Sequence, residues 1–117
     1  MGKIERKRRV MFVDQNVKDA LQKLKTGTFE QKRLFDSLEE ARDKLEKNPF
    51  VGVRVQKALW PKIYVKRYGI NNLRKMDLPE GWRIVYTIKG NEIEIVAIIL
   101  EWFSHKQYEK RFGYKSG

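Results

Sequence analysis

The sequence predicts an α+β domain: a curved antiparallel sheet with an N-terminal helical hairpin on one face and a short C-terminal helix. Three observations predict it. Apolar residues recur at helical spacing between residues 15 and 47. From residue 51 onwards they alternate with period two. Near the C-terminus, the glycine-asparagine pair of KGN separates two runs rich in β-branched residues, which is typical of a β-hairpin.

A strand and a helix are expected first. Residues 1–8 are interpreted as a mobile basic tail, and residues 9–117 as a single domain. The run RVMFVD is β-branched and aromatic, as strands are. Asp14 is a suitable N-cap for a helix that ends at Gly27. One face of this helix carries an apolar stripe, made of Val17, Ala20, Leu21 and Leu24.

A second helix follows at once. Thr28 and Gln31 have the spacing of a capping box at its start. Its apolar stripe consists of Leu34, Leu38, Ala41 and Leu45. Pro49 disfavours a helical conformation at Asn48, so the helix is expected to end there. Because the link between the two helices is short, they are predicted to pack as an antiparallel hairpin.

The remaining segments are mostly predicted strands. VGVRVQ and NLRKMDL alternate with period two, whereas WPKIYVKRYG between them fits either a strand end or a helical turn. After the turn LPEG, the runs WRIVYTI and EIEIVAIILEW form the two arms of the hairpin around KGN. SHKQYEKRF is predicted as a short terminal helix with Ser104 as its N-cap.

The strand WRIVYTI is expected to divide its side chains between two faces of the sheet. The face toward the helical hairpin receives Trp82, Ile84, Tyr86 and Ile88. Arg83 then points to the opposite face, which is expected to be open. The alternative is that Arg83 only pairs with a surface glutamate across the hairpin, such as Glu92 or Glu94.

Composition excludes several classes of function. The chain of 117 residues has no cysteine, which excludes a disulfide framework, a zinc-thiolate site and a cysteine nucleophile. A single histidine excludes a multi-histidine metal site. The longest apolar run, IEIVAIIL, is shorter than the roughly 20 residues of a membrane span, and residues 1–10 lack the apolar region of a secretory signal. We therefore expect a soluble, cytoplasmic protein.

The net charge of +11 arises from 26 lysines and arginines against 15 acidic residues. A field of this size attracts polyanions and accelerates their encounter with the protein. Nucleic acid and an acidic protein both remain possible partners, because charge alone does not distinguish them.

In the segment LEWFSHKQYEKRFGY, the only histidine, His105, lies between aromatic and basic residues. An unperturbed imidazole titrates near pH 6.5, which suits general acid or base catalysis. Tyr108 follows three residues later and shares a side of the predicted helix with it. The alternative is that His105 caps or packs at a helix end and that Tyr108 is a core aromatic residue.

Four features together resemble the RelE/ParE superfamily of type II toxins, and within it the RelE- and HigB-like mRNA endonucleases. The order of elements matches, and NPFVG resembles the family's proline-containing junction. LPEGWRIVYTI is similar to the family strand that carries an arginine, at Arg83, and SHKQYEK is similar to a His-x-x-Tyr ending at His105 and Tyr108. The resemblance covers the chain from about Val10 to Tyr108.

The resemblance implies cleavage of mRNA on the ribosome without a metal or other cofactor. In this reaction the ribose 2′-OH attacks the adjacent phosphorus. Arg83 is expected to stabilise charge on the phosphoryl oxygens, with His105 and Tyr108 in proton transfer or positioning. Further cations for RNA phosphates are expected from Arg74, Lys75 and Lys106.

The sequence differs from the family pattern in two places, and the family allows two other functions. RelE has two lysines on the strand before the arginine; here Arg74 matches one of them and Met76 stands at the other. LWPKIYVKRYGIN is longer than the usual family loop. ParE-like relatives inhibit DNA gyrase without cleaving RNA, which is the second hypothesis. The third hypothesis is a non-catalytic relative that only binds RNA or protein. The superfamily also implies a cognate antitoxin, expected to be acidic and amphipathic.

Overall fold

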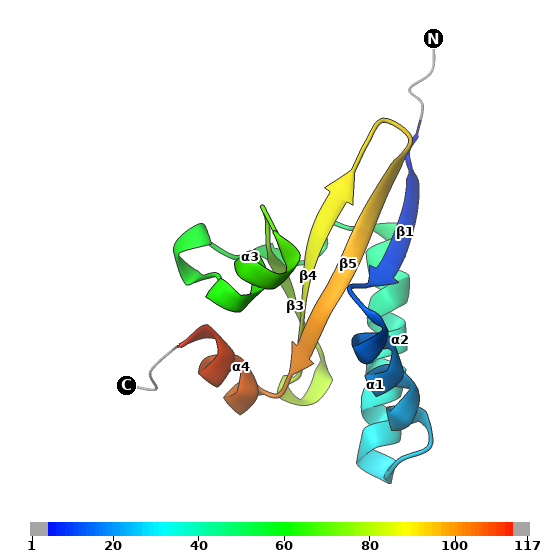
Figure 1. The fold of residues 1–117 in the computed structure, drawn as a ribbon. Coiled ribbons are helices and arrows are strands. Elements are labelled where there is room, and N and C mark those ends of the chain that lie inside the picture. The colour runs from blue at the N-terminus through cyan, green and yellow to red at the C-terminus, as the bar shows by residue number, and fades with distance from the viewer. Residues whose placement is uncertain (1–4, 114–117) are drawn as a thin grey trace.

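The structure, a computed structural model, describes residues 5–113. Figure 1 shows the order of the helices and strands along the chain. They are β1 (Lys7–Phe12), α1 (Gln15–Lys25), α2 (Phe29–Lys47), β2 (Val53–Arg54), α3 (Lys62–Tyr68), β3 (Arg74–Asp77), β4 (Arg83–Gly90), β5 (Glu94–Phe103) and α4 (His105–Phe112). Short 3-10 turns precede α3, at Lys57–Leu59, and β4, at Pro79–Gly81.

Five strands form one sheet in the order β1-β5-β4-β3-β2. The α+β class is confirmed, but the sheet is mixed, because β1 runs parallel to β5 while the other pairs are antiparallel. The sequence did not indicate this, since the direction of a strand depends on a partner distant in the chain. The strand β1 already begins at Lys7, so Lys7 and Arg8 are not part of a tail; residues 1–4 of the predicted tail lie outside the described residues.

The predicted helical hairpin is confirmed. The Asp14 carboxylate accepts a hydrogen bond from the Val17 amide at 3.0 Å, and Thr28 and Gln31 form the expected capping box. The hairpin packs on one face of the sheet against a core that contains Leu21, Leu34, Leu38, Ala41, Leu45, Met76, Ile84, Tyr86, Ala97 and Ile99. Trp82 and Ile88 pack at its edge, so the predicted inner face of β4 is correct.

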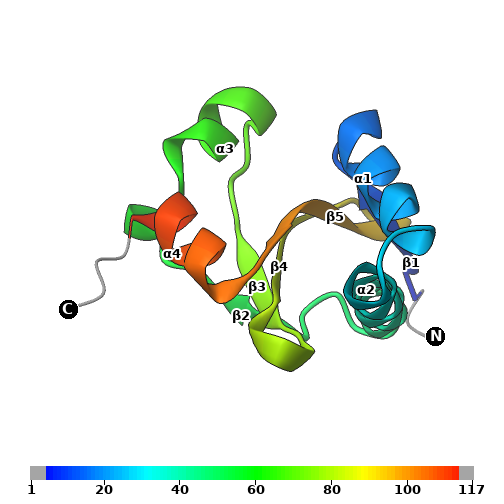
Figure 2. The same cartoon turned by 90° about the horizontal axis from the view of Figure 1, so that it is seen from below.

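The opposite face of the sheet is not open, contrary to expectation. Figure 2 shows α3 and α4 on the side of the sheet away from α1 and α2. They cover a second core made of Val55, Tyr64, Ile70, Leu73, Val85, Leu100, Phe103, Tyr108 and Phe112. The segment that fitted either a strand or a turn forms α3, because its Tyr64 is buried in this core at 1% exposure.

A bulge in β5 decides which side chains reach the second core. Val85 pairs with Glu101 but its neighbour Tyr86 pairs with Ile99, so Leu100 is the extra residue. A bulge of one residue exchanges the faces of all residues beyond it. Trp102 consequently packs beside the helical hairpin, and Phe103 lies against α4.

Candidate functional site

Two basic side chains from adjacent strands meet one aromatic ring of the C-terminal helix. The Arg83 guanidinium carbon lies 4.6 Å from the centroid of the Tyr108 ring, and the Lys75 ammonium nitrogen lies 5.4 Å from it. Lys75 pairs with Val85, two residues from Arg83 on β4, so both cations point to the face covered by α4. We call Lys75, Arg83 and Tyr108 the cation cluster.

Tyr108 is buried among aromatic neighbours. Its side chain is 1% exposed. Its ring stacks on Phe112 with centroids 4.3 Å apart and meets Phe103 edge to face at 6.3 Å. A cation over an aromatic face is attracted by the ring quadrupole, so the buried ring fixes where the two charges of Lys75 and Arg83 sit.

The guanidinium of Arg83 also contacts an anion. Its Nε atom lies 3.1 Å from Oδ1 of Asp77, the residue opposite it on β3. The carboxylate is 72% exposed, whereas the Arg83 side chain is only 23% exposed. An ion pair with such an exposed partner is weak, because water screens it. Asp77 therefore contributes little to holding the Arg83 side chain in place.

The alternative predicted for Arg83, a pair with a surface carboxylate, is met by Asp77 and not by Glu92 or Glu94. Glu94 instead pairs with Arg9, with 3.0 Å between the arginine Nε and the carboxylate. Asp77 takes the place beside Arg83 because antiparallel pairing of β3 and β4 puts these two residues directly opposite each other.

His105 begins α4 directly after the confirmed N-cap, Ser104. Its side chain is 60% exposed, and its Nε2 atom lies 2.8 Å from Oε1 of Glu109 one turn later. A carboxylate beside Nε2 favours the neutral tautomer that carries its proton on that nitrogen, in which Nδ1 is the nitrogen able to accept a proton. A Cβ placed on Gly81, two residues before Arg83, would lie 4.0 Å from the His105 Cβ. His105 therefore lies at the corner where β4 begins.

The other predicted cations do not join the cluster. Arg74 pairs with Tyr86, and this register puts it on the face opposite to Arg83. Its guanidinium donates hydrogen bonds to the carbonyls of Gly52, at 2.6 Å, and Phe50, at 3.2 Å. Lys106 is exposed on the surface of α4.

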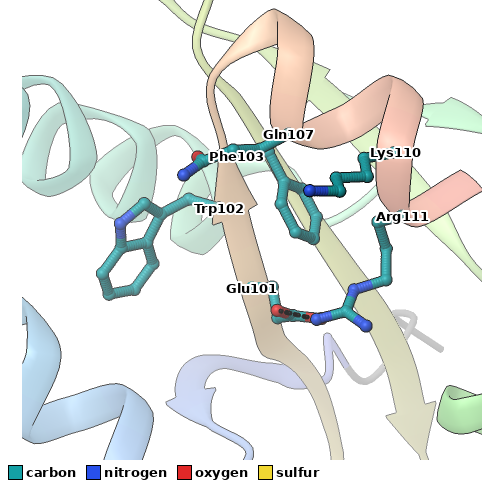
Figure 3. Close-up of a pocket in the computed structure, with 6 residues that line it drawn as sticks. All are labelled: Glu101, Trp102, Phe103, Gln107, Lys110 and Arg111. Atoms are coloured by element: carbon teal, nitrogen blue, oxygen red, sulfur yellow. Dashed lines mark hydrogen bonds and ion pairs between the residues drawn. The ribbon is translucent and has the colours of Figure 1, made fainter.

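A groove runs along the side of α4, and Figure 3 shows the residues that line it. Across it the guanidinium of Arg111 pairs with the carboxylate of Glu101 on β5 at 3.2 Å. This pair and the buried rings of Tyr108 and Phe112 attach α4 to the sheet. The position of His105, at the start of the same helix, is fixed by these contacts.

Two residues of the site were missed in the sequence. Glu109 has a detectable signal, because it stands four residues after His105 on a predicted helix and such residues are neighbours on the helix surface. Asp77 has none, since its contact with Arg83 depends on the register of two strands.

Comparison with known families matches residues 13–100 to the ParE toxin of the type II toxin-antitoxin system parDE. The chain belongs to the ParE toxin family. It is thus a member of the RelE/ParE superfamily, as the sequence features predicted, and a type II toxin whose family implies a cognate antitoxin. No curated protein and no solved structure matches the chain.

The match to the ParE toxin family includes Lys75 and Arg83 but ends before α4. His105, Tyr108 and Glu109 therefore lie outside the matched region, and their roles depend on the geometry described above. Among the helices within residues 5–113, none is both long enough and apolar enough to span a membrane.

Proposed function

We propose that this ParE-family toxin is a ribosome-dependent mRNA endoribonuclease of the cytoplasm. The cation cluster carries the proposal: Lys75 and Arg83 converge on Tyr108 at the end of the sheet where His105 is exposed. Two fixed positive charges beside an accessible imidazole suit the cleavage of a phosphodiester, in which negative charge grows on the phosphoryl oxygens.

In the proposed reaction the 2′-oxygen of one nucleotide forms a bond to the adjacent phosphorus while the bond from phosphorus to the 5′-oxygen breaks. The proton of the 2′-OH passes to Nδ1 of His105, and the leaving 5′-oxygen takes a proton from water. Arg83 binds two phosphoryl oxygens through its planar guanidinium, in place of Asp77. The products are a 2′,3′-cyclic phosphate and a 5′-OH.

Tyr108 has a positioning role in this proposal. With 1% exposure, its side chain is a poor candidate for direct proton transfer to RNA, and its ring instead supports Lys75 and Arg83. Lys75 supplies a second cation near the phosphate. Lys106, exposed on α4, is proposed to contact RNA beyond the scissile phosphate, whereas the hydrogen bonds of Arg74 to Phe50 and Gly52 argue against a phosphate-binding role.

The test is incubation of the purified toxin with ribosomes that hold a defined mRNA, followed by mapping of new RNA ends. We expect cleavage in the ribosomal A site, with 5′-OH and cyclic phosphate ends, and no cleavage by an Arg83→Ala variant. Intact mRNA after incubation with a folded, toxic protein would refute the proposal.

A second function, inhibition of DNA gyrase, is favoured by one observation. The match to the ParE toxin family ends before α4, so the matched region lacks His105 and Tyr108. A gyrase inhibitor does not need these residues. Loss of supercoiling activity in a purified gyrase assay, without any RNA product, would identify this function. Binding to RNA or to the antitoxin without either activity would identify a non-catalytic relative.

A further inference from the structure

Positive charge is concentrated in one segment of the chain. Residues 47–76 contain eight lysines and arginines and no acidic residue, so they supply eight of the eleven net positive charges. In the rest of the chain, cations and anions nearly balance. We call residues 47–76 the basic segment.

The basic segment contains β2, α3 and most of β3. β2 is the edge strand of the sheet opposite to β1, and β3 is its neighbour. Six of its cations are exposed: Lys47, Arg54, Lys57, Lys62, Lys66 and Arg67. Figure 2 shows α3 on the same side of the sheet as α4. Lys75, near the end of the segment, belongs to the cation cluster, so the exposed charges belong to the same segment as a residue of the proposed catalytic site.

These charges have no anionic partner among the residues that the structure describes. Within residues 5–113 there are seven ion pairs, and none of them includes a residue of the basic segment. On α3, Lys62 and Lys66 stand four residues apart, and like charges at that spacing destabilise a helix. The helix is held by the burial of Tyr64 instead. Such repulsion is relieved when an external anion binds.

We propose that the basic segment is a docking surface for the phosphate backbone of double-helical RNA. Nucleic-acid duplexes carry closely spaced phosphates; double-stranded DNA, for example, has one negative charge per about 1.7 Å of its axis. Such a backbone suits a surface of several unpaired lysines and arginines better than isolated carboxylates do. The inference rests on the proposed function only for the choice of RNA as the polyanion. An acidic protein would be expected to use Ile63 and Val65 as well, since both are exposed on α3.

The experiment measures binding of a fluorescent RNA hairpin made of 2′-O-methyl nucleotides, which lacks the 2′-OH and is not cleaved. Anisotropy titrations at several salt concentrations compare the toxin with a variant carrying Gln at Lys57, Lys62, Lys66 and Arg67. A control variant carries Gln at Lys18, Lys23, Lys25 and Lys32, which are exposed on the helical hairpin. Both variants lose the same charge, and thermal unfolding establishes that each is folded.

Affinity for RNA falls as the salt concentration rises. We expect the substitutions at Lys57, Lys62, Lys66 and Arg67 (the segment variant) to make the slope of log affinity against log salt less steep by about 3, because each lost phosphate contact removes about 0.9 from it. The control variant is expected to change the slope by less than about 1. Equal losses in both variants would show that only net charge matters and would overturn the inference. Unchanged RNA binding by the segment variant, or loss of antitoxin binding alone, would overturn it as well.

The outcome is independent of catalysis. A toxin that binds the hairpin through the basic segment but leaves ribosome-bound mRNA intact would refute the proposed function and support this inference.

Discussion

The guanidinium of Arg83 on β4 lies over the ring of Tyr108 on α4, 4.6 Å from its centroid, and joins the sheet to the C-terminal helix. If this guanidinium stabilises the transition state, Arg83→Ala should slow cleavage of ribosome-bound mRNA by about 100-fold or more. Arg83→Lys should recover little of the rate, because an ammonium group lacks the planar fork that binds two oxygens. Single-turnover cleavage measures both.

The matched control for Arg83 is Arg33→Lys, on the exposed ion pair of Arg33 with Glu80. Its cleavage rate should be that of the unmodified toxin. An Arg83→Ala variant that cleaves at the normal rate would show that Arg83 has no role in catalysis.

Because the ring of Tyr108 is buried, two substitutions of this residue should have different effects on stability and cleavage. Tyr108→Phe keeps the ring and should retain cleavage within about threefold while losing about 1 kcal/mol of stability with the hydroxyl. Tyr108→Ala leaves a cavity and should lower the free energy of unfolding by about 3–5 kcal/mol. Urea unfolding and cleavage assays measure these effects. A large loss of cleavage in a stable Tyr108→Phe protein would instead assign the phenol a part in proton transfer.

The contact of 2.8 Å between His105 and Glu109 predicts a preferred tautomer of the imidazole. Because the chain has one histidine, nitrogen NMR observes His105 without overlap. We expect the proton on Nε2 in the neutral ring, and loss of this preference in Glu109→Gln, since an amide both donates and accepts hydrogen bonds. The rate of cleavage should fall in the same variant.

Glu40→Gln, on the exposed pair with Lys44, is the control for Glu109. It should change neither the imidazole tautomer nor the rate. If the imidazole keeps its tautomer in Glu109→Gln, the carboxylate has only a helix-stabilising role.

Stability should fall in alkaline solution because of buried tyrosines. Burial, together with the nearby carboxylate of Glu101, raises the pKa of Tyr64, and burial also raises the pKa of Tyr86. Unfolded tyrosines ionise near pH 10, whereas the folded protein retains these protons. Below pH 10 the protonated buried tyrosines make their full contribution to the free energy of unfolding. Above pH 10 the free energy of unfolding falls by about 1.4 kcal/mol per pH unit for each such group.

Urea unfolding at pH values from 8 to about 11 tests this dependence. Tyr64→Phe removes one ionising group and should make the alkaline decline shallower, whatever its effect at pH 8. An equal decline in the variant and the unmodified toxin would contradict a raised pKa at Tyr64.

The hydrogen bonds of Arg74 to the Phe50 and Gly52 carbonyls predict a structural effect. Tyr86 holds the same turn, since its hydroxyl donates to the Pro49 carbonyl and accepts from the Gly52 amide. Arg74→Ala should lower the free energy of unfolding by about 1–2 kcal/mol, with cleavage by the folded fraction unchanged. If Arg74→Ala is stable but binds RNA more weakly, Arg74 binds phosphate after all.

Local patterns in the sequence determined much of the fold. Caps and apolar stripes predicted α1 and α2, and Ser104 marked the start of α4. Alternation along β4 put Arg83 on the face away from the helical hairpin. These features could be predicted because each depends on residues within a few positions of one another.

The tertiary structure alone decided which side chains meet. Alternation makes Arg74 and Lys75 face opposite ways, but only the register of β3 on β4 shows that Lys75 faces Tyr108. Only the packing of α3 and α4 buries Tyr108 and closes a face that the sequence left open. The physical reason is that strand register and helix docking depend on contacts between residues distant in the chain, which no local pattern records.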